Sequence, residues 1–302
     1  MDINFFKKTR ILDGGMGQEL LARGMKPQGT LWSANALLQE KYHKLLFDTH
    51  KDFVKAGAEV IITTSFTTRK IRLRDNNVED KFEYLNQKAG EIAKKVKEIY
   101  PKVLIAGGLP PQSLTYEADD RSDTEITDDF YSQAKILNNY CDFFYFDVLS
   151  SVREFQLAIN SIDEFKKPFL LGAHISEGTF LPSGETLTDI CKKIPKEKLL
   201  GIVLACVSPE NFEKNLDEIK KLGIPFGFKL NAFIRTNPKP NYTGAYKKSK
   251  TGNPNEFLGQ RKDLNPKKMA EFAKKFKEAG ATILGGCCET RPAHIKEISK
   301  LV

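Results

Sequence analysis

The fold of this chain is decided by the stretch Thr282-Ile283-Leu284-Gly285-Gly286-Cys287-Cys288, close to the end of its 302 residues. A short apolar run leads into two glycines and two adjacent cysteines, and such a run is consistent with a buried strand. Adjacent cysteines rarely bond to each other, because the disulfide geometry is strained between neighbours. Two adjacent thiolates can instead bind one soft metal ion. The stretch therefore predicts a strand that ends in metal ligands.

Seven similar apolar runs precede this one and alternate with amphipathic segments. The runs are Arg10–Leu12, Val60–Thr64, Val103–Ala106, Phe143–Phe146, Phe169–Ala173, Gly201–Ala205 and Phe226–Leu230. The helix-periodic segments include Ala36–Ala56, Asp80–Ile99, Thr127–Asn138 and Pro266–Ala279. Buried strands that alternate with helices indicate parallel pairing. Eight such units predict an α/β fold, a single (β/α)8 TIM barrel over residues 1–302, rather than an open doubly wound sheet.

Composition narrows the class of protein. The net charge is +8, but the lysines are scattered over helical segments, which indicates a solvated surface and not a nucleic-acid site. No run approaches the ~20 apolar residues of a membrane span, and the N-terminus does not resemble a signal peptide. The five cysteines are an odd number, which favours a reducing cytoplasm and thiol or metal chemistry over a disulfide framework.

The barrel prediction gives the cysteines a common location, because barrel chemistry sits at the C-terminal ends of the strands. The residues expected at this mouth are Asp13 and Gly14 after the first strand, Asp147 after the fourth, Cys206 after the sixth, and Cys287 and Cys288 after the eighth. Three thiolates are the ligand number of a catalytic zinc site with an open fourth position. Cys141 and Cys191, in segments read as helical, are expected to be core residues.

Several other polar features have a structural interpretation or more than one interpretation. His174 follows the fifth expected strand and either contacts the site or is a satisfied structural histidine. The segment Ile234–Gln260 is rich in Asn, Pro, Lys and Gly, and is expected to form a long loop after the seventh strand. Gly14, Gly15 and Gly17 do not have the spacing of a dinucleotide-binding motif.

Four stretches together resemble the homocysteine S-methyltransferases, in order along nearly the whole chain. They are Ile11-Leu12-Asp13-Gly14-Gly15-Met16-Gly17, Leu31-Trp32-Ser33-Ala34, Ala56–Phe66 and Ala279–Cys288. The resemblance implies a zinc enzyme in which Cys206, Cys287 and Cys288 hold the metal and a homocysteine thiol takes the open position. It also implies that Asp13 and Asp147 lie near the homocysteine amine, although the family usually has Glu at the second position.

The resemblance extends to the rest of the substrate site. Asn231 matches a family asparagine, and Trp32 matches a residue that lines the methyl-donor pocket of the betaine enzymes. Two tyrosines of that pocket are replaced by Thr67 and Val148, which puts betaine in doubt. A sulfonium such as S-methylmethionine or dimethylsulfoniopropionate is therefore the expected donor. Its cation would meet Trp32 and Phe66.

The donor assignment leaves some alternatives. The donor's carboxylate could be bound by one of the lysines or arginines near the mouth, for example Arg69 or Lys70, and Tyr242 or Tyr246 of the long loop could rebuild the betaine cage. Selenocysteine or another thiol is an alternative acceptor, and a structural-zinc barrel is the non-enzymatic alternative. L-homocysteine and a small cationic methyl donor are the expected partners, and the oligomeric state is left open.

Overall fold

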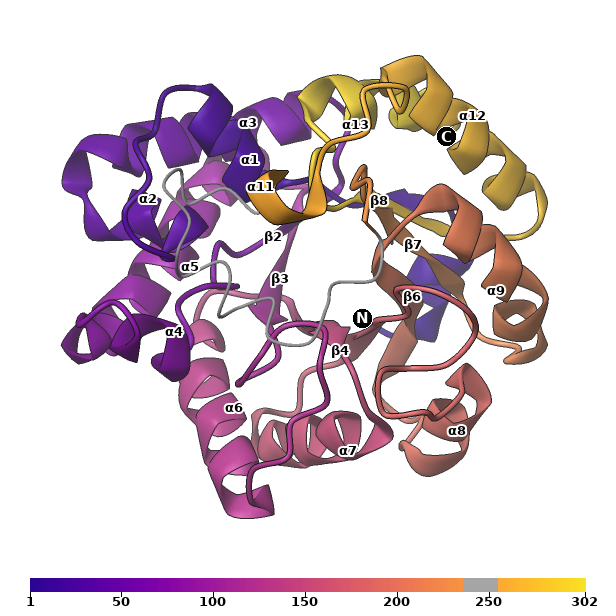
Figure 1. The fold of residues 1–302 in the computed structure, drawn as a ribbon, viewed down its shortest axis with the longest axis horizontal. Coiled ribbons are helices and arrows are strands. Elements are labelled where there is room, and N and C mark those ends of the chain that lie inside the picture. The colour runs from indigo at the N-terminus through magenta and orange to yellow at the C-terminus, as the bar shows by residue number, and fades with distance from the viewer. Residues whose placement is uncertain (236–254) are drawn as a thin grey trace.

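A computed structural model describes residues 1–235 and 255–302 of the chain. Eight parallel strands form one sheet in the order β1-β8-β7-β6-β5-β4-β3-β2. A bridge between Leu12 and Val60 joins the two edges of this sheet, so the sheet closes into a barrel. Figure 1 shows the helices arranged as a ring around the strands. The predicted (β/α)8 barrel is confirmed.

The strands agree with the apolar runs in number and order, and differ at their ends. Their bounds are β1 Arg10–Ile11, β2 Val60–Ile62, β3 Leu104–Leu109, β4 Phe143–Leu149, β5 Phe169–Ala173, β6 Leu199–Val207, β7 Phe226–Leu230 and β8 Ile283–Gly286. Strands β4 and β6 extend past the expected ends. Asp147 and Cys206 therefore lie within the last residues of their strands, and not beyond them.

The helices have the bounds α1 Met16–Ala22, α2 Asn35–Leu38, α3 His43–Lys55, α4 Lys70–Arg74, α5 Phe82–Ile99, α6 Asp123–Leu137, α7 Val152–Ser161, α8 Leu187–Lys193, α9 Pro209–Lys221, α11 Asn255–Leu258, α12 Pro266–Glu278 and α13 Pro292–Ser299. Helix α6 begins four residues earlier than expected, because Ser122 and Glu125 form a capping box. The expected helix Ala36–Ala56 is interrupted at Gln39, whose backbone is extended and whose side chain bonds Asn35 and Gln28.

The barrel interior is filled by apolar side chains below the mouth. One buried cluster joins Leu12, Tyr145, Leu170, Val203 and Ile283 from different strands. A short 3-10 turn, Ile3–Lys7, adds Phe6 to this cluster. The Phe6 ring meets Phe143 edge-on, with 6.1 Å between ring centroids. Because the base is packed in this way, the open end of the barrel is the mouth at the C-terminal ends of the strands.

The segment expected as a loop after β7 contains more structure than expected. Helix α11 lies within it, and Phe233 forms an antiparallel bridge with Gln260. Tyr242 and Tyr246 lie outside the described residues. Among the helices that the structure describes, none combines the length and apolar character needed to cross a membrane.

Candidate functional site

Three cysteine sulfurs converge at the mouth of the barrel. Cys206 comes from β6, and Cys287 and Cys288 directly follow β8. Their sulfurs all lie within 4.8 Å of one another, and Cys288 Sγ is 3.9 Å from each of the other two. Zinc–thiolate bonds of about 2.3 Å in a tetrahedron separate sulfurs by about 3.8 Å. The donor set therefore fits three ligands of one tetrahedral zinc ion.

The charges of the thiols depend on one another. Hydrogen bonds from Cys287 and Cys288 hold the pKa of Cys206 well below its ordinary value. The same hydrogen bonds, made to a sulfur that carries negative charge, raise the pKa of Cys287 and of Cys288. Without a metal the cluster therefore favours one thiolate and two thiols, and all three can be ionised together only with a cation among them.

The backbone is strained where it delivers site residues. The β4–β5 register shifts between Phe146 and Leu149, and the β6–β7 register shifts between Ala205 and Val207. At these two irregularities Val148 has a φ of 68° and Cys206 a φ of 56°, which is uncommon for residues other than glycine and especially for a β-branched one. Irregularities of this kind re-aim side chains. They occur next to Asp147 and at Cys206 itself.

Three polar side chains surround Cys206. The Asn231 amide donates to the carbonyl of Cys206 at 2.7 Å, and its nitrogen is 3.6 Å from the Cys206 sulfur. The Tyr116 hydroxyl is 3.2 Å from that sulfur, and its ring packs against His174 at a tilt of 36°, with 4.5 Å between ring centroids. His174 also contacts Ala205 O and Ser176 Oγ. It is thus a hydrogen-bonded residue behind Tyr116, and it does not join the cysteine cluster.

Two carboxylates and one lysine lie beside the cysteines in the same cavity. Asp13 Oδ2 accepts the backbone N–H of Ile62 at 2.8 Å, and Lys229 Nζ lies 3.5 Å from Asp13 Oδ1. Burial raises the pKa of Asp13 to about 6, although the charge of Lys229 opposes this rise. Burial also raises the pKa of Asp147. The sequence reasoning found both carboxylates and missed the lysine.

Aromatic side chains form another wall of the cavity. Trp32 and Phe66 meet edge to face, with centroids 6.4 Å apart and an interplanar angle of 89°. A Cβ at Gly17 would lie 2.0 Å from the Trp32 indole, so the glycine permits this position of the ring. Thr67, Val148 and Tyr116 also line the cavity, as does Gly14. Asn231 is not among the lining residues and contacts the site through Cys206.

The basic side chain at this wall is Arg72, and not Arg69 or Lys70, the two examples named from the sequence. Arg69 is fully buried, and donates to Phe66 O and Thr115 Oγ1. Lys70 points away and pairs with Asp129 at 3.0 Å. Neither residue lines the cavity, whereas Arg72 of α4 does and is 4% exposed. Periodicity does not indicate the direction of this side chain, because α4 is only five residues long.

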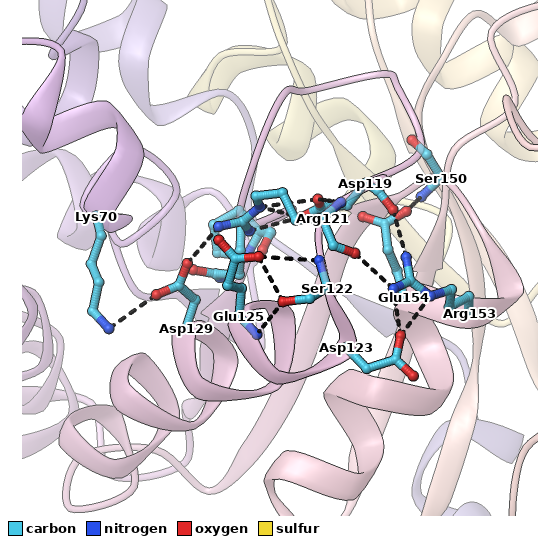
Figure 2. Close-up of polar contacts among 12 residues, drawn as sticks. Lys70, Asp119, Arg121, Ser122, Asp123, Glu125, Asp129, Ser150, Arg153 and Glu154 are labelled. Carbon is cyan, nitrogen blue, oxygen red and sulfur yellow. Dashed lines mark hydrogen bonds and ion pairs between the residues drawn. The ribbon is translucent and has the colours of Figure 1, made fainter.

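A polar network holds the loop that carries Thr115 and Tyr116. Figure 2 shows Arg121 between Asp119 and Asp129, at 2.8 and 2.9 Å, and Lys70 on the other side of Asp129. Arg153 of α7 donates to the carbonyls of Asp119 and Arg121. The network links this loop to α4, α6 and α7, and so fixes the loop over the mouth.

The other two cysteines lie apart from the cluster. Cys191 belongs to α8 as expected, but it is only partly buried and not a core residue. Cys141 was expected in a helix, but it lies between α6 and β4, where it is buried. Helix α6 ends at Leu137, so the turn that leads into β4 contains this cysteine.

Comparison with known proteins assigns the chain to a family. The homocysteine S-methyltransferase family model matches residues 10–302. Homocysteine S-methyltransferase 2 of Saccharomyces cerevisiae is 28% identical, over 98% of this chain and 94% of its own length. A selenocysteine Se-methyltransferase of Brassica oleracea is 25% identical, over 96% of this chain and 88% of its own.

A solved structure shares the fold. It is the metallated form of the Escherichia coli homocysteine methyltransferase MmuM, with a TM-score of 0.79 and 21% identity over 98% of this chain and 96% of that one. The fold, the order of the motifs and the match over residues 10–302 agree. This chain belongs to the homocysteine S-methyltransferase family and is a methyltransferase.

Proposed function

We propose that the chain transfers a methyl group from a sulfonium donor to the thiol of L-homocysteine, with zinc held by Cys206, Cys287 and Cys288. The observation that carries this proposal is the cluster of three sulfurs within 4.8 Å at the barrel mouth. Three protein ligands leave one tetrahedral position for a substrate. Zinc bound there would supply a soft cation that favours the acceptor thiol as its nucleophilic thiolate at neutral pH.

The acceptor's amino group belongs beside Asp13 and Asp147. Each carboxylate has one buried oxygen, Oδ1, with no hydrogen bond of ordinary geometry from the described residues, although Lys229 Nζ lies 3.5 Å from that of Asp13. A buried acceptor without a donor is costly, and a substrate ammonium would supply the missing donors in a charge-assisted contact. Gly14 lines the cavity next to Asp13.

The methyl donor belongs against Trp32 and Phe66. These rings line the cavity and can face a cation, a contact of about 0.5–2 kcal/mol. Thr67 and Val148 occupy the positions where the betaine enzymes have tyrosines, so a trimethylammonium group would be less enclosed. Tyr116 adds an aromatic ring from another loop. The donor's carboxylate is assigned to Arg72, because this guanidinium lines the cavity and Arg69 and Lys70 do not.

The reaction is a displacement at the methyl carbon. The acceptor sulfur forms a bond to this carbon, and the donor's carbon–sulfur bond breaks with its electron pair on the leaving sulfur. The sulfonium becomes a neutral thioether, so charge is lost as the reaction proceeds. A site that excludes water favours such a step, and the two walls of the cavity would align the two substrates.

X-ray absorption at the zinc edge, with and without homocysteine, tests the acceptor site. We expect one additional sulfur neighbour when homocysteine is added. An unchanged metal environment would contradict binding of the thiol at the metal, and would favour a structural zinc site.

Methionine formation from homocysteine with each donor in turn tests the donor. We expect S-methylmethionine or dimethylsulfoniopropionate to give a higher kcat/KM than glycine betaine at equal concentrations. A betaine value that equals or exceeds the sulfonium values would overturn the donor assignment alone. Because the relatives include a selenocysteine Se-methyltransferase, the assay includes selenocysteine as a competing acceptor.

A further inference from the structure

Lys229 is a buried cation at the centre of the acceptor site. It lies in β7 and is 5% exposed. Its Nζ is 3.5 Å from Asp13 Oδ1 and 5.5 Å from the centroid of the Tyr145 ring. Burial would lower the pKa of Lys229, but the charges of Asp13, Asp147 and Cys287 together outweigh it and raise the pKa. The side chain therefore carries a full positive charge.

The two carboxylates need such a neighbour. Like charges in a dry cavity repel, and the charge of Asp147 contributes to the raised pKa of Asp13. The charge of Lys229 is the largest influence that lowers the pKa of both Asp13 and Asp147. Two carboxylates and one ammonium leave one net negative charge, which one substrate ammonium would neutralise.

Lys229 could act through the two carboxylates or bind the acceptor's own carboxylate, and its position distinguishes these two roles. Tyr145, whose ring Lys229 contacts, belongs to the packed layer below the mouth. The ammonium is thus directed to Asp13 and to the floor of the cavity. This placement favours an action through the carboxylates over direct contact with the acceptor's own carboxylate.

We propose that Lys229 is a positioning residue whose ammonium holds Asp13 and Asp147 as a pair of ionised carboxylates, so that the site selects acceptors with a free α-amine. This proposal rests on the proposed acceptor site. It gives Lys229 a part in acceptor specificity, and it requires no contact between Lys229 and the substrate.

Three acceptors separate the roles of amine and carboxylate. They are homocysteine, 3-mercaptopropan-1-amine, which lacks the carboxylate, and 4-mercaptobutanoate, which lacks the amine. For Lys229→Met we expect KM to rise about 10- to 100-fold for the two acceptors that carry an amine, homocysteine and 3-mercaptopropan-1-amine. This is the range typical of outer-shell partners. The KM for 4-mercaptobutanoate, kcat at saturation and the zinc content are expected to stay within about 2-fold.

Three further variants keep the proposal testable. Lys229→Arg preserves the charge and is expected to recover most of the lost affinity, while Lys229→Gln serves if the Met variant folds poorly. Lys97→Met removes the lysine of another carboxylate pair, far from the cavity, and is expected to leave all three KM values unchanged.

Binding can be measured without catalysis. Trp32 is the only tryptophan of the chain and lines the cavity, so its fluorescence reports binding of L-methionine, 3-(methylthio)propan-1-amine and 4-(methylthio)butanoate. If homocysteine is not methylated with any donor, the proposed function fails, and this titration still decides the role of Lys229.

Three results would overturn the inference. A rise in KM for homocysteine and 4-mercaptobutanoate, with the amine unaffected, would mean that Lys229 binds the acceptor's carboxylate. An equal loss for all acceptors together with zinc would indicate a structural role. Unchanged values in a folded Lys229→Met protein would show that the carboxylates need no counter-ion.

Discussion

Two carboxylate–lysine pairs lie at opposite ends of the same barrel, and they are built alike. At the base, Asp142 precedes β4 and pairs with Lys97. At the mouth, Asp13 follows β1 and pairs with Lys229. Each carboxylate also accepts a backbone N–H from a neighbouring strand, at 2.7 Å for Asp142 and 2.8 Å for Asp13.

The two pairs differ in completeness and in exposure. Lys97 Nζ is 2.6 Å from both oxygens of Asp142, and the side chains of this pair are 29% and 27% exposed. Lys229 Nζ lies 3.5 Å from Oδ1 of Asp13, and the side chains of this pair are 6% and 4% exposed. The pair at the base is fully hydrogen-bonded and partly exposed to solvent. The pair at the mouth is buried, and Oδ1 of Asp13 accepts no hydrogen bond of ordinary geometry there. One arrangement thus serves stability at the base and ligand binding at the mouth.

The largest effect is expected from a change at the mouth, at the cysteine cluster. Cys287→Ser should lose most of the zinc and lower kcat/KM by at least about 100-fold, since even outer-shell partners of a metal contribute 10- to 100-fold. Metal content by mass spectrometry and methionine formation measure this. Cys191→Ser, outside the cluster, is the matched control and should retain metal and activity. Full activity of zinc-free Cys287→Ser protein would refute the mechanism.

The next effect concerns the carboxylates. Asp13→Asn keeps an oxygen for the N–H of Ile62 and removes the charge. We expect the homocysteine KM to rise about 10-fold or more, which corresponds to about 1.4 kcal/mol or more of lost attraction to the substrate ammonium. Asp147→Asn should act in the same direction, and zinc content should not change in either variant. An unchanged KM in both would mean that the carboxylates are structural.

The pH dependence of kcat/KM should also be set by a residue at the mouth, Asp13. Burial raises the pKa of Asp13 to about 6, so this carboxylate loses its charge as the pH falls through 6 while the substrate ammonium keeps its own. The value of kcat/KM should then fall about 10-fold per pH unit below this point. In Lys229→Met the fall should begin at higher pH, because Lys229 holds the pKa of Asp13 down.

Folding is expected to respond to the same ionisation with the opposite sign. The folded-state pKa of Asp13 lies above the ordinary value of 3.8. Its ionisation therefore costs stability as the pH rises from about 4 to 6, and protonation favours the folded state. Circular dichroism at each pH should show a folded enzyme while activity is lost. Loss of structure over the same range would contradict the assignment of the activity change to Asp13.

The sequence predicted those parts of the molecule that follow from the spacing of apolar residues and from the order of strands along the chain. Buried apolar runs identified the eight strands, and the rule that strand ends meet at one mouth brought Cys206, Cys287 and Cys288 together with Asp13 and Asp147. Lys229 could also have been found. It is a charged residue in an apolar strand, two residues before Asn231 and therefore on the same inward face.

Other features had no signal in the sequence. The irregularities at Val148 and Cys206 depend on how neighbouring strands pair, and no residue type there requires them. Tyr116 and Arg72 come from a loop and a five-residue helix, where neither periodicity nor spacing indicates the direction of a side chain. For this reason the sequence did not single out Arg72 from its neighbours Arg69 and Lys70, which do not line the cavity.

The smallest effect is expected at the base. Asp142→Asn keeps an acceptor for the N–H of Ile105 and weakens the pair with Lys97, whose partly exposed charge is worth about 1 kcal/mol or less. For a chain of this size we expect Tm to fall by about 2 °C, and homocysteine KM and zinc content to stay at wild-type values. Thermal unfolding together with steady-state kinetics measures both, with Asp13→Asn as the counterpart from the mouth. A higher KM in Asp142→Asn would show that the two ends of the barrel are coupled, and would break the division between a stabilising base and a binding mouth.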